Sequence, residues 1–302
     1  MTTATLAHSE SLIGTAVPAD TFILLETPQP WGKPALLSPG VPESLRQVVK
    51  PLLAVGVRVH LIANEQTAEQ GQRRILIFQR SPQQSMQLEV GYKSWEIQVD
   101  SAAEMAPALE AFFQNGSRLS LSSQRHLMVC THASHNECCG LYGYPFYLDA
   151  IATTQQFGLT HIQPWQISHI GGHRFAPTLI DFPHGRYYGN LDHDSLLCLL
   201  KQEGDIEPLL SSYRGWSLLP KPLQILEAEL FSQHKWDWLQ GRVAGRILKQ
   251  HQGNTWAELW FESPKHSLRR YTAELQNNEL LNYQLQPSES SSVRYPMERK
   301  TG

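Results

Sequence analysis

The sequence has little net charge and no long apolar run. Its 302 residues hold 25 lysines and arginines against 28 aspartates and glutamates, which gives a formal net charge of −3 at pH 7. This balance gives no reason to expect binding to nucleic acid or to a membrane surface. No apolar stretch approaches the ~20 residues that a membrane helix needs. Residues 1–14 lack the basic and apolar parts of a secretory signal, so we expect a soluble, cytoplasmic protein.

Cysteine is also scarce, with four residues in the whole chain. Four thiols in a chain of this length do not make a disulfide scaffold, and clustered cysteines in a cytosolic protein more often bind a metal or act in catalysis. All four cysteines and eight of the 13 histidines lie between residues 126 and 198. This local density indicates a site built from thiols and imidazoles.

The first part of the chain predicts a small α/β domain at residues 20–116, after a flexible tail at residues 1–19. Short β-branched runs there alternate with segments of helical spacing. The expected strands are residues 21–26, 57–62, 74–79 and 92–99, and the expected helices are residues 43–54 and 102–114. Trp31 lies in a loop between Pro30 and Gly32, and we expect it to be a packing anchor.

Residues 117–230 predict a second α/β domain with a thioredoxin-like order of elements. The expected elements are strands 126–130, 160–167, 177–182 and 186–189, a helix over 145–157, and a helix from the N-cap Asp192 to about residue 202. In open α/β sheets, sites usually lie on loops at the ends of strands. Pro164 suggests an edge or an irregularity. Pro177 precedes a strand, where thioredoxin-like folds often place a cis-proline.

The C-terminal part predicts a helix plus β-hairpin extension at residues 231–286. A helical stretch covers residues 220–240, and we expect residues 241–250 to continue it as a basic helix. Residues 255–262 and 268–275 alternate on either side of S-P-K-H-S, which predicts a hairpin. Residues 287–302 are rich in serine, proline and charge and predict a disordered tail.

Two segments hold the candidate ligands. Residues 130–140 read C-T-H-A-S-H-N-E-C-C-G, and residues 168–174 read S-H-I-G-G-H-R. Thiolates and imidazoles together are the ligand set of an iron–sulfur cluster or of zinc. Gly171 and Gly172 argue against a helical histidine pair, and they suit a loop whose backbone closely approaches a bulky inorganic core.

Several other interpretations stay open from the residues alone. The thiols and histidines could be ordinary buried side chains. A thioredoxin-type dithiol needs C-x-x-C, whereas Cys138 and Cys139 are adjacent. A closed zinc site is chemically sound, although Cys130 and Cys139 are further apart than zinc-finger cysteines. A Rieske centre needs a histidine in a C-x-H pattern on two loops, and Cys130-Thr131-His132 supplies one half of it.

The two segments resemble the sucrase/ferredoxin-like family of thioredoxin-like ferredoxins. P-H-G-R-Y-Y-G at residues 183–189 and L-L-E-T-P-Q-P-W-G at residues 24–32 add to this resemblance. It implies a [2Fe–2S] cluster held by two cysteines and two histidines outside the Rieske pattern. Carried onto this sequence, the implied ligands are Cys130, Cys139, His169 and His173. The choice of Cys139 over Cys138 rests on the resemblance.

The resemblance implies a soluble electron-transfer protein or a small reductase that works with a redox partner protein. Two neutral imidazoles leave the cluster with two fewer negative charges than four thiolates do, so it should be reduced more easily than plant-type ferredoxins, whose potentials are about −400 mV. A histidine ligand can also lose its second proton, which would couple reduction to proton uptake. The alternative is a structural zinc or thiol-redox module that acts as a protein-binding domain.

Overall fold

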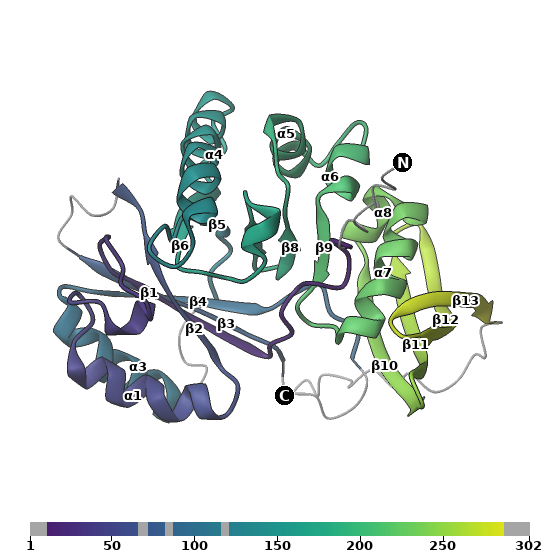
Figure 1. Ribbon diagram of the computed structural model, residues 1–302, viewed down its shortest axis with the longest axis horizontal. Coiled ribbons are helices and arrows are strands. Elements are labelled where there is room, and N and C mark those ends of the chain that lie inside the picture. Colours follow the sequence, from purple (N-terminus) through teal and green to yellow (C-terminus); the bar gives the residue numbers. More distant parts are fainter. Residues whose placement is uncertain (1–10, 66–71, 82–86, 116–120, 287–302) are drawn as a thin grey trace, which may run out of the picture.

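A computed structural model describes residues 11–65, 72–81, 87–115 and 121–286 of the chain. A mixed sheet of nine strands forms its centre, and a second, antiparallel sheet of four strands lies at one end (Figure 1). The expected α/β class is confirmed. No helix in the described ranges is both long and apolar enough to cross a membrane.

The large sheet combines strands from both predicted α/β sections. Its strands are β1 (Thr21–Glu26), β2 (Arg58–Ala63), β3 (Arg73–Gln79), β4 (Lys93–Val99), β5 (Arg125–Cys130), β6 (Ile162–Ile167), β7 (Leu179–Phe182), β8 (Arg186–Tyr188) and β9 (Tyr213–Trp216). In space they follow the order β4-β3-β1-β2-β6-β5-β7-β8-β9. Strands β2 and β6 join the two sections through the residue pairs Ile62–Ile167 and Ala63–Gln166. The division into domains at residues 20–116 and 117–230 stays a prediction.

Helices cover both faces of this sheet. One face carries α1 (Glu43–Ala54) and α3 (Met105–Asn115), and the other carries α4 (Glu137–Gln156) and α5 (His193–Lys201) (Figure 1). The short elements are η1 (Ala35–Leu37), η2 (Ala102–Glu104), η3 (His173–Phe175) and α6 (Glu207–Ser211). Asp192 caps α5, as expected, because its side chain accepts a hydrogen bond from the Ser195 backbone at 2.9 Å.

The central strand β1 supplies side chains to two cores. Ile23 and Leu25 pack in the core under α1 and α3, whereas Phe22 and Leu24 pack in the core under α4. A strand that is buried on both faces needs apolar side chains at successive positions rather than at alternate ones. This requirement explains the unbroken apolar run in β1, whose six residues are all buried.

Helix α4 begins eight residues earlier than the sequence predicted. The expected start was Pro145, but Asn136 caps the helix by accepting a hydrogen bond from the Cys138 backbone at 3.0 Å. Cys138 and Cys139 therefore lie on the first turn of a helix and not on a loop. Gly143 lets the helix approach β5 closely, because a Cβ atom there would lie 2.0 Å from the carbonyl oxygen of Cys130.

The C-terminal part corrects a second prediction, since residues 241–250 do not form a basic helix. Residues 242–250 belong to β10 (Arg242–His251), which pairs with β11 (Asn254–Ser263). Pairing across the sheet decides the structure: Arg246, spaced like a helical neighbour of Arg242, instead pairs with Glu258 on β11. The predicted hairpin is confirmed as β11 and β12 (His266–Gln276), and β13 (Glu279–Gln286) completes the sheet.

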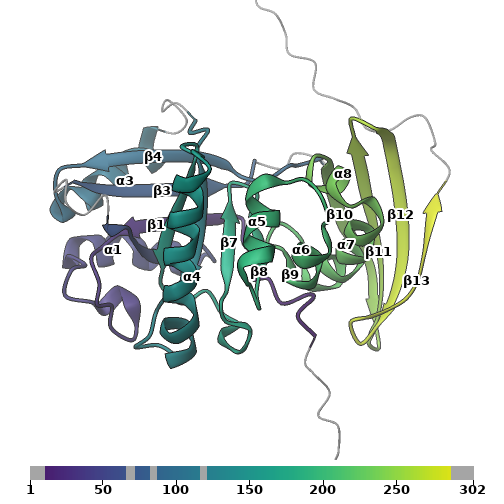
Figure 2. The ribbon, with the colours of Figure 1, turned by 90° about the horizontal axis from the view of Figure 1, so that it is seen from above.

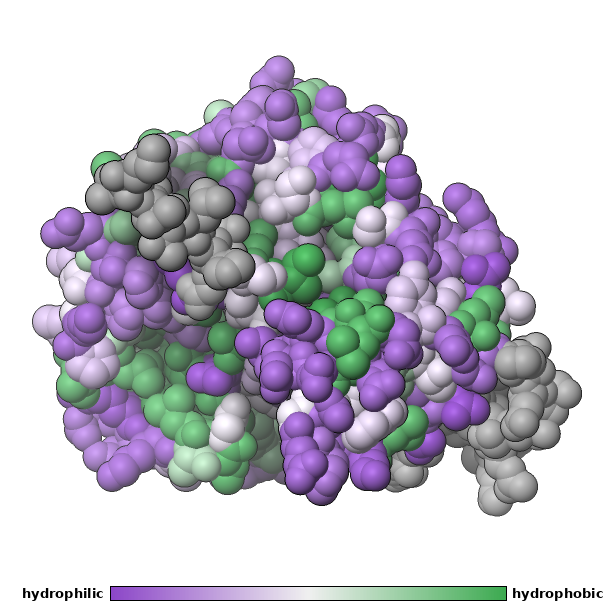
Figure 3. Space-filling view, turned by 45° about the vertical axis from the view of Figure 1, so that its right-hand side comes forward, coloured by the Kyte–Doolittle hydropathy of each residue, from purple (hydrophilic) through white to green (hydrophobic). Residues whose placement is uncertain are grey.

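The small sheet lies beyond two helices, α7 (Lys221–His234) and α8 (Trp236–Leu239) (Figure 2). These helices replace the single long helix expected over residues 220–240. On the face drawn in Figure 3, apolar residues gather in separate patches with polar residues between them. Residues 287–302, predicted to be disordered, lie outside the described residues.

The described part of the predicted tail, residues 11–19, contacts the large sheet. The backbone of Gly14 donates to the carbonyl of Arg214 at 2.9 Å, and Ala16 is buried. Trp31 is buried and donates from its indole nitrogen to the carbonyl of Thr27 at 2.9 Å, which confirms the packing role.

Two expectations about prolines are also confirmed. The peptide bond before Pro177 is cis. Pro164 lies in an irregular part of the sheet, because β6 meets β2 only at Gln166 and Ile167.

Candidate metal centre

The candidate ligands meet where β5 and β6 end. The two strands are parallel neighbours, so their carboxyl ends lie at the same edge of the sheet. Cys130 is the last residue of β5, and His169 follows the end of β6 by two residues. Cys139 enters from the first turn of α4, and His173 begins η3.

Three of the four predicted residues converge closely. One candidate ligand atom from each of Cys130, Cys139 and His169 lies within 4.8 Å of the others. Both cysteines are buried, and His169 is half-buried. The Sγ atom of Cys139 is 3.6 Å from His169 Nδ1. The ring centroid of His173 is 5.7 Å from that of His169, so the fourth predicted residue lies next to His169 but outside the group of three.

The structure separates the other two cysteines from this group. Cys138 is partly exposed on the turn that carries Cys139, but Cys139 is the one that meets Cys130 and His169. Cys198 is buried in α5, where its Sγ lies 3.2 Å from the carbonyl oxygen of Asp205.

The pKa values of the two buried thiols are shifted in opposite directions. A hydrogen bond from Cys139 lowers the pKa of Cys130 well below its ordinary value, against the opposing effect of burial. The same hydrogen bond, with burial, raises the pKa of Cys139, because a second negative charge beside the first is unfavourable. The pair therefore carries one negative charge more easily than two, and a bound cation would offset the second charge.

His132 joins the N-terminal loop to the loop that carries His169. Its Nε2 donates to the carbonyl oxygen of Gly32 at 2.9 Å, and its Nδ1 accepts from the backbone of His169 at 3.2 Å. These two bonds fix the tautomer of the ring and engage both of its nitrogens. Burial lowers the pKa of His132, which keeps the imidazole neutral. The sequence did not indicate this role, although it showed the histidine.

The N-terminal loop around Trp31 is hydrogen-bonded to residues next to the candidate ligands. The side-chain amide of Gln29 donates to Thr131 Oγ1 at 3.0 Å and to Gln166 Oε1 at 2.8 Å. Ser134 donates to the carbonyl oxygen of Trp31. The loop therefore fixes both the start of the cysteine segment and the end of β6.

Arg214 holds the loop that carries the two histidines, a role that no sequence motif indicates. Its guanidinium donates to the carbonyl oxygens of Gly171 and Thr15 at 3.2 and 2.8 Å. Gly172 has a φ of +75°, and a Cβ atom there would lie 2.5 Å from Arg214 Nη2. Gly172 therefore permits the close approach of the Arg214 guanidinium. Burial lowers the pKa of Arg214 to about 10.

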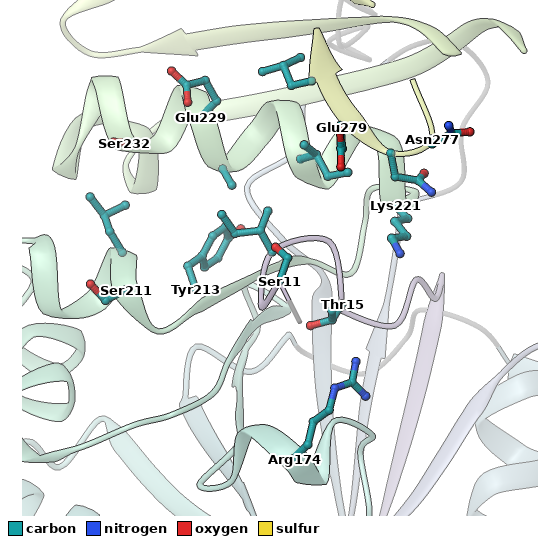
Figure 4. A pocket seen from close by; sticks show the side chains of 16 residues that line it. Ser11, Thr15, Arg174, Ser211, Tyr213, Lys221, Glu229, Ser232, Asn277 and Glu279 are labelled. Carbon is teal, nitrogen blue, oxygen red and sulfur yellow. The ribbon is translucent and has the colours of Figure 1, made fainter. Parts of the chain in front are cut away.

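A pocket of about 670 Å³ lies beside this loop. It is bounded by residues 11–15, α7 and the β12–β13 turn, and Arg174, the residue after His173, forms part of its floor (Figure 4). The side chains of Arg174 and Lys221 reach into it from different walls (Figure 4). Neither Cys130 nor Cys139 lines the pocket, so it adjoins the candidate centre without containing it.

The comparisons with known proteins agree with these observations. The model of the family described as sucrase/ferredoxin-like matches residues 12–215. No curated protein and no solved structure matches the chain. The family match covers more than half of the chain and includes the N-terminal loop, both ligand segments and Arg214. The chain therefore belongs to the sucrase/ferredoxin-like family.

Proposed function

We propose that this protein transfers electrons through a [2Fe–2S] cluster. The proposed ligands are Cys130, Cys139, His169 and His173. The convergence of two buried thiols and an imidazole within 4.8 Å, with a second imidazole adjacent, is the observation that supports the proposal. Iron–sulfur clusters are held by thiolates, and imidazoles replace two of them in some centres.

The donor set of this chain fits such a group. The pKa of Cys130 is lowered by its hydrogen bonds, so this thiol becomes a thiolate without a large cost. Cys130 and Cys139 lie on a strand end and a helix start, which are rigid supports. His169 and His173 lie on a loop that Arg214 fixes at Gly171. The bound cluster would supply the one-electron chemistry.

The histidines set the expected redox behaviour. Neutral imidazoles carry two fewer negative charges than the thiolates they replace, which favours the reduced state. A proton taken up by a histidine on reduction would make the potential depend on pH. His132 helps to hold His169 in place as a ligand, because His132 Nδ1 accepts a hydrogen bond from the backbone of His169.

The electron donor or acceptor is proposed to be a redox partner protein that contacts the start of α4. Leu141, Tyr142 and Tyr144 are exposed on this helix, within about two turns of Cys139. Exposed apolar and aromatic side chains of this kind are typical of contact surfaces. We also propose that the protein works in the cytoplasm, where thiols stay reduced.

Metal analysis tests the proposal directly. Iron, acid-labile sulfide and zinc are counted in the full-length protein after purification without oxygen. We expect iron and sulfide in equal amounts, and coupling to nitrogen in the electron paramagnetic resonance spectrum of the reduced protein. A colourless protein with zinc at the cysteine site, and neither iron nor sulfide, would contradict the proposal.

The second candidate function is a structural zinc module. It is favoured by the same convergence, because ligand atoms within 4.8 Å of one another also suit a single ion. Zinc takes cysteine and histidine ligands in tetrahedral sites. The metal count distinguishes the two functions, since zinc brings no sulfide.

A further inference from the structure

A second group of candidate ligands lies where α7 and α8 meet the small sheet. His234 is the last residue of α7, Asp237 lies in α8, and His266 is the first residue of β12. One ligand atom of each lies within 4.8 Å of the others. All three follow residue 215, where the family match ends, and none of them belongs to the centre described above.

Asp237 gives the first reason to regard this group as a metal site. Its side chain is buried, and its Oδ2 accepts a hydrogen bond from Ser263 Oγ at 2.7 Å. Its Oδ1 is buried and has no hydrogen-bond partner among the described residues. A buried carboxylate oxygen without a partner is costly, and a bound cation would remove that cost.

The spacing of the ligand atoms gives the second reason. His266 Nε2 and Asp237 Oδ2 are 3.5 Å apart. An N–H···O hydrogen bond is shorter, about 2.7 to 3.2 Å between heavy atoms. Two ligands held at about 2.0 to 2.1 Å from a tetrahedral ion lie roughly 3.3 Å from each other. The observed distance is therefore closer to that of two ligands of one ion than to a good hydrogen bond.

The imidazole ring of His234 is held in one orientation. The hydroxyl of Tyr271 lies 2.8 Å from His234 Nε2 and fixes the orientation of the ring. Lys235 separates the two helices with φ 52° and ψ −131°, and this sharp break lets His234 and Asp237 contribute to one group.

From this geometry we propose that His234, Asp237 and His266 bind one divalent transition-metal ion, and that this ion is zinc, which binds two imidazoles and one carboxylate in other proteins. Zinc accepts two histidines and a carboxylate from a protein and takes a further ligand from solvent. The ion joins the break between α7 and α8 to the turn between β11 and β12. Ser263 supports this arrangement, because it donates to Asp237 and accepts from the backbone of His266 at 3.1 Å.

Arg269 competes with the ion. Its Nη2 donates to His266 Nδ1 at 2.8 Å, so in this state the proton of the neutral ring is on Nε2. An ion bound at Nε2 requires the proton to be on Nδ1 instead, and Arg269 must then release the ring. The total number of protons on the ring is unchanged. Loss of Arg269 should therefore strengthen zinc binding.

Zinc titration of the full-length protein tests the proposal, with Asp237→Asn as the near-isosteric variant. Zinc is measured by competition with a chromogenic chelator and counted after gel filtration. We expect Asp237→Asn to lose one zinc ion, or to bind it on the order of 100-fold more weakly. The double variant Cys130→Ser/Cys139→Ser should keep that ion, which separates this site from the cysteine site and from the fate of the proposed cluster.

Two further variants distinguish a metal site from a group of side chains held together by hydrogen bonds alone. Arg269→Gln should bind zinc several-fold more tightly, whereas Lys265→Gln removes a nearby exposed positive charge and should change little. His266→Gln changes a half-buried residue and repeats the ligand test if Asp237→Asn does not fold. Equal zinc content and affinity in the wild type and in the folded ligand variants would overturn the proposal.

Discussion

At the scale of single residues, adjacent side chains of the same type have different surroundings. Cys139 is buried against Cys130 and His169, whereas Cys138 is partly exposed on the same helical turn. Both have the chemistry of a ligand, and their positions in the sequence differ by one. The helix decides between them, because successive residues point about 100° apart around its axis.

This difference predicts the outcome of two matched substitutions. Cys139→Ser should abolish the iron and sulfide content of the purified protein, since serine cannot replace a thiolate ligand of the proposed cluster. Cys138→Ser should keep the cluster and its visible absorption. Iron and sulfide counts measure both, and circular dichroism checks that both variants fold. If Cys138→Ser loses the cluster and Cys139→Ser keeps it, the ligand is Cys138.

Composition and spacing located the site but not the contacts that organise it. The dense histidines indicated a metal centre, yet His126 is a core residue whose Nδ1 accepts from Trp165 at 3.1 Å. Burial lowers the pKa of His126 to about 3. Arg214 holds Gly171 from 43 residues away in the chain. A contact of this kind depends on the sheet order, which no local pattern records.

At the scale of elements, the start of α4 decides where Cys139 lies. Asn136 supplies the cap, because its side chain accepts from the backbone of Cys138. Glu137 in the first turn adds a favourable interaction with the helix dipole. Pro145 misled the prediction, since proline marks the first turn of a helix more often than its interior. The cap and the close packing of Gly143 on Cys130 support the longer helix.

The cap predicts a measurable loss of stability in Asn136→Ala. Removing an N-cap side chain costs about 1 kcal/mol of unfolding free energy. We expect this loss in urea denaturation, together with weaker retention of the metal at the cysteine site, because the turn that carries Cys139 frays. Asn136→Asp keeps a capping oxygen and is the matched control. A loss of similar size in Asn136→Asp would mean that capping is not the function of Asn136.

The strand β10 marks the limit of local prediction at this scale. Arg242, Arg246 and Lys249 lie in the segment that the sequence predicts to continue the preceding helix as a basic helix. In the structure Arg246 and Arg270 both pair with Glu258, at the centre of the small sheet. Strand preference depends strongly on neighbouring strands, so the pairing partner sets the element.

At the scale of the whole molecule, the two predicted α/β domains share a core. Phe78 on β3 stacks on Phe182 of β7 with ring centroids 4.1 Å apart, and Phe22 of β1 lies 5.0 Å from the same ring. The composition predicted two α/β sections, and it could not predict that their strands hydrogen-bond into one sheet. Such shared burial predicts that both sections unfold as one cooperative unit.

Hydrogen exchange on two matched variants tests this cooperativity. Phe182→Leu removes part of the shared core, and Phe112→Leu removes an equal amount from the core under α1 and α3, where Phe112 packs on Trp95. In one cooperative unit, each variant lowers the protection of β1 and β5 alike, by roughly 1–2 kcal/mol. In two independent domains, Phe112→Leu would lower the protection of β1 and leave β5 unchanged. The stacking of Phe78 on Phe182 makes the first result the expected one, because neither section can keep its core closed when the other opens.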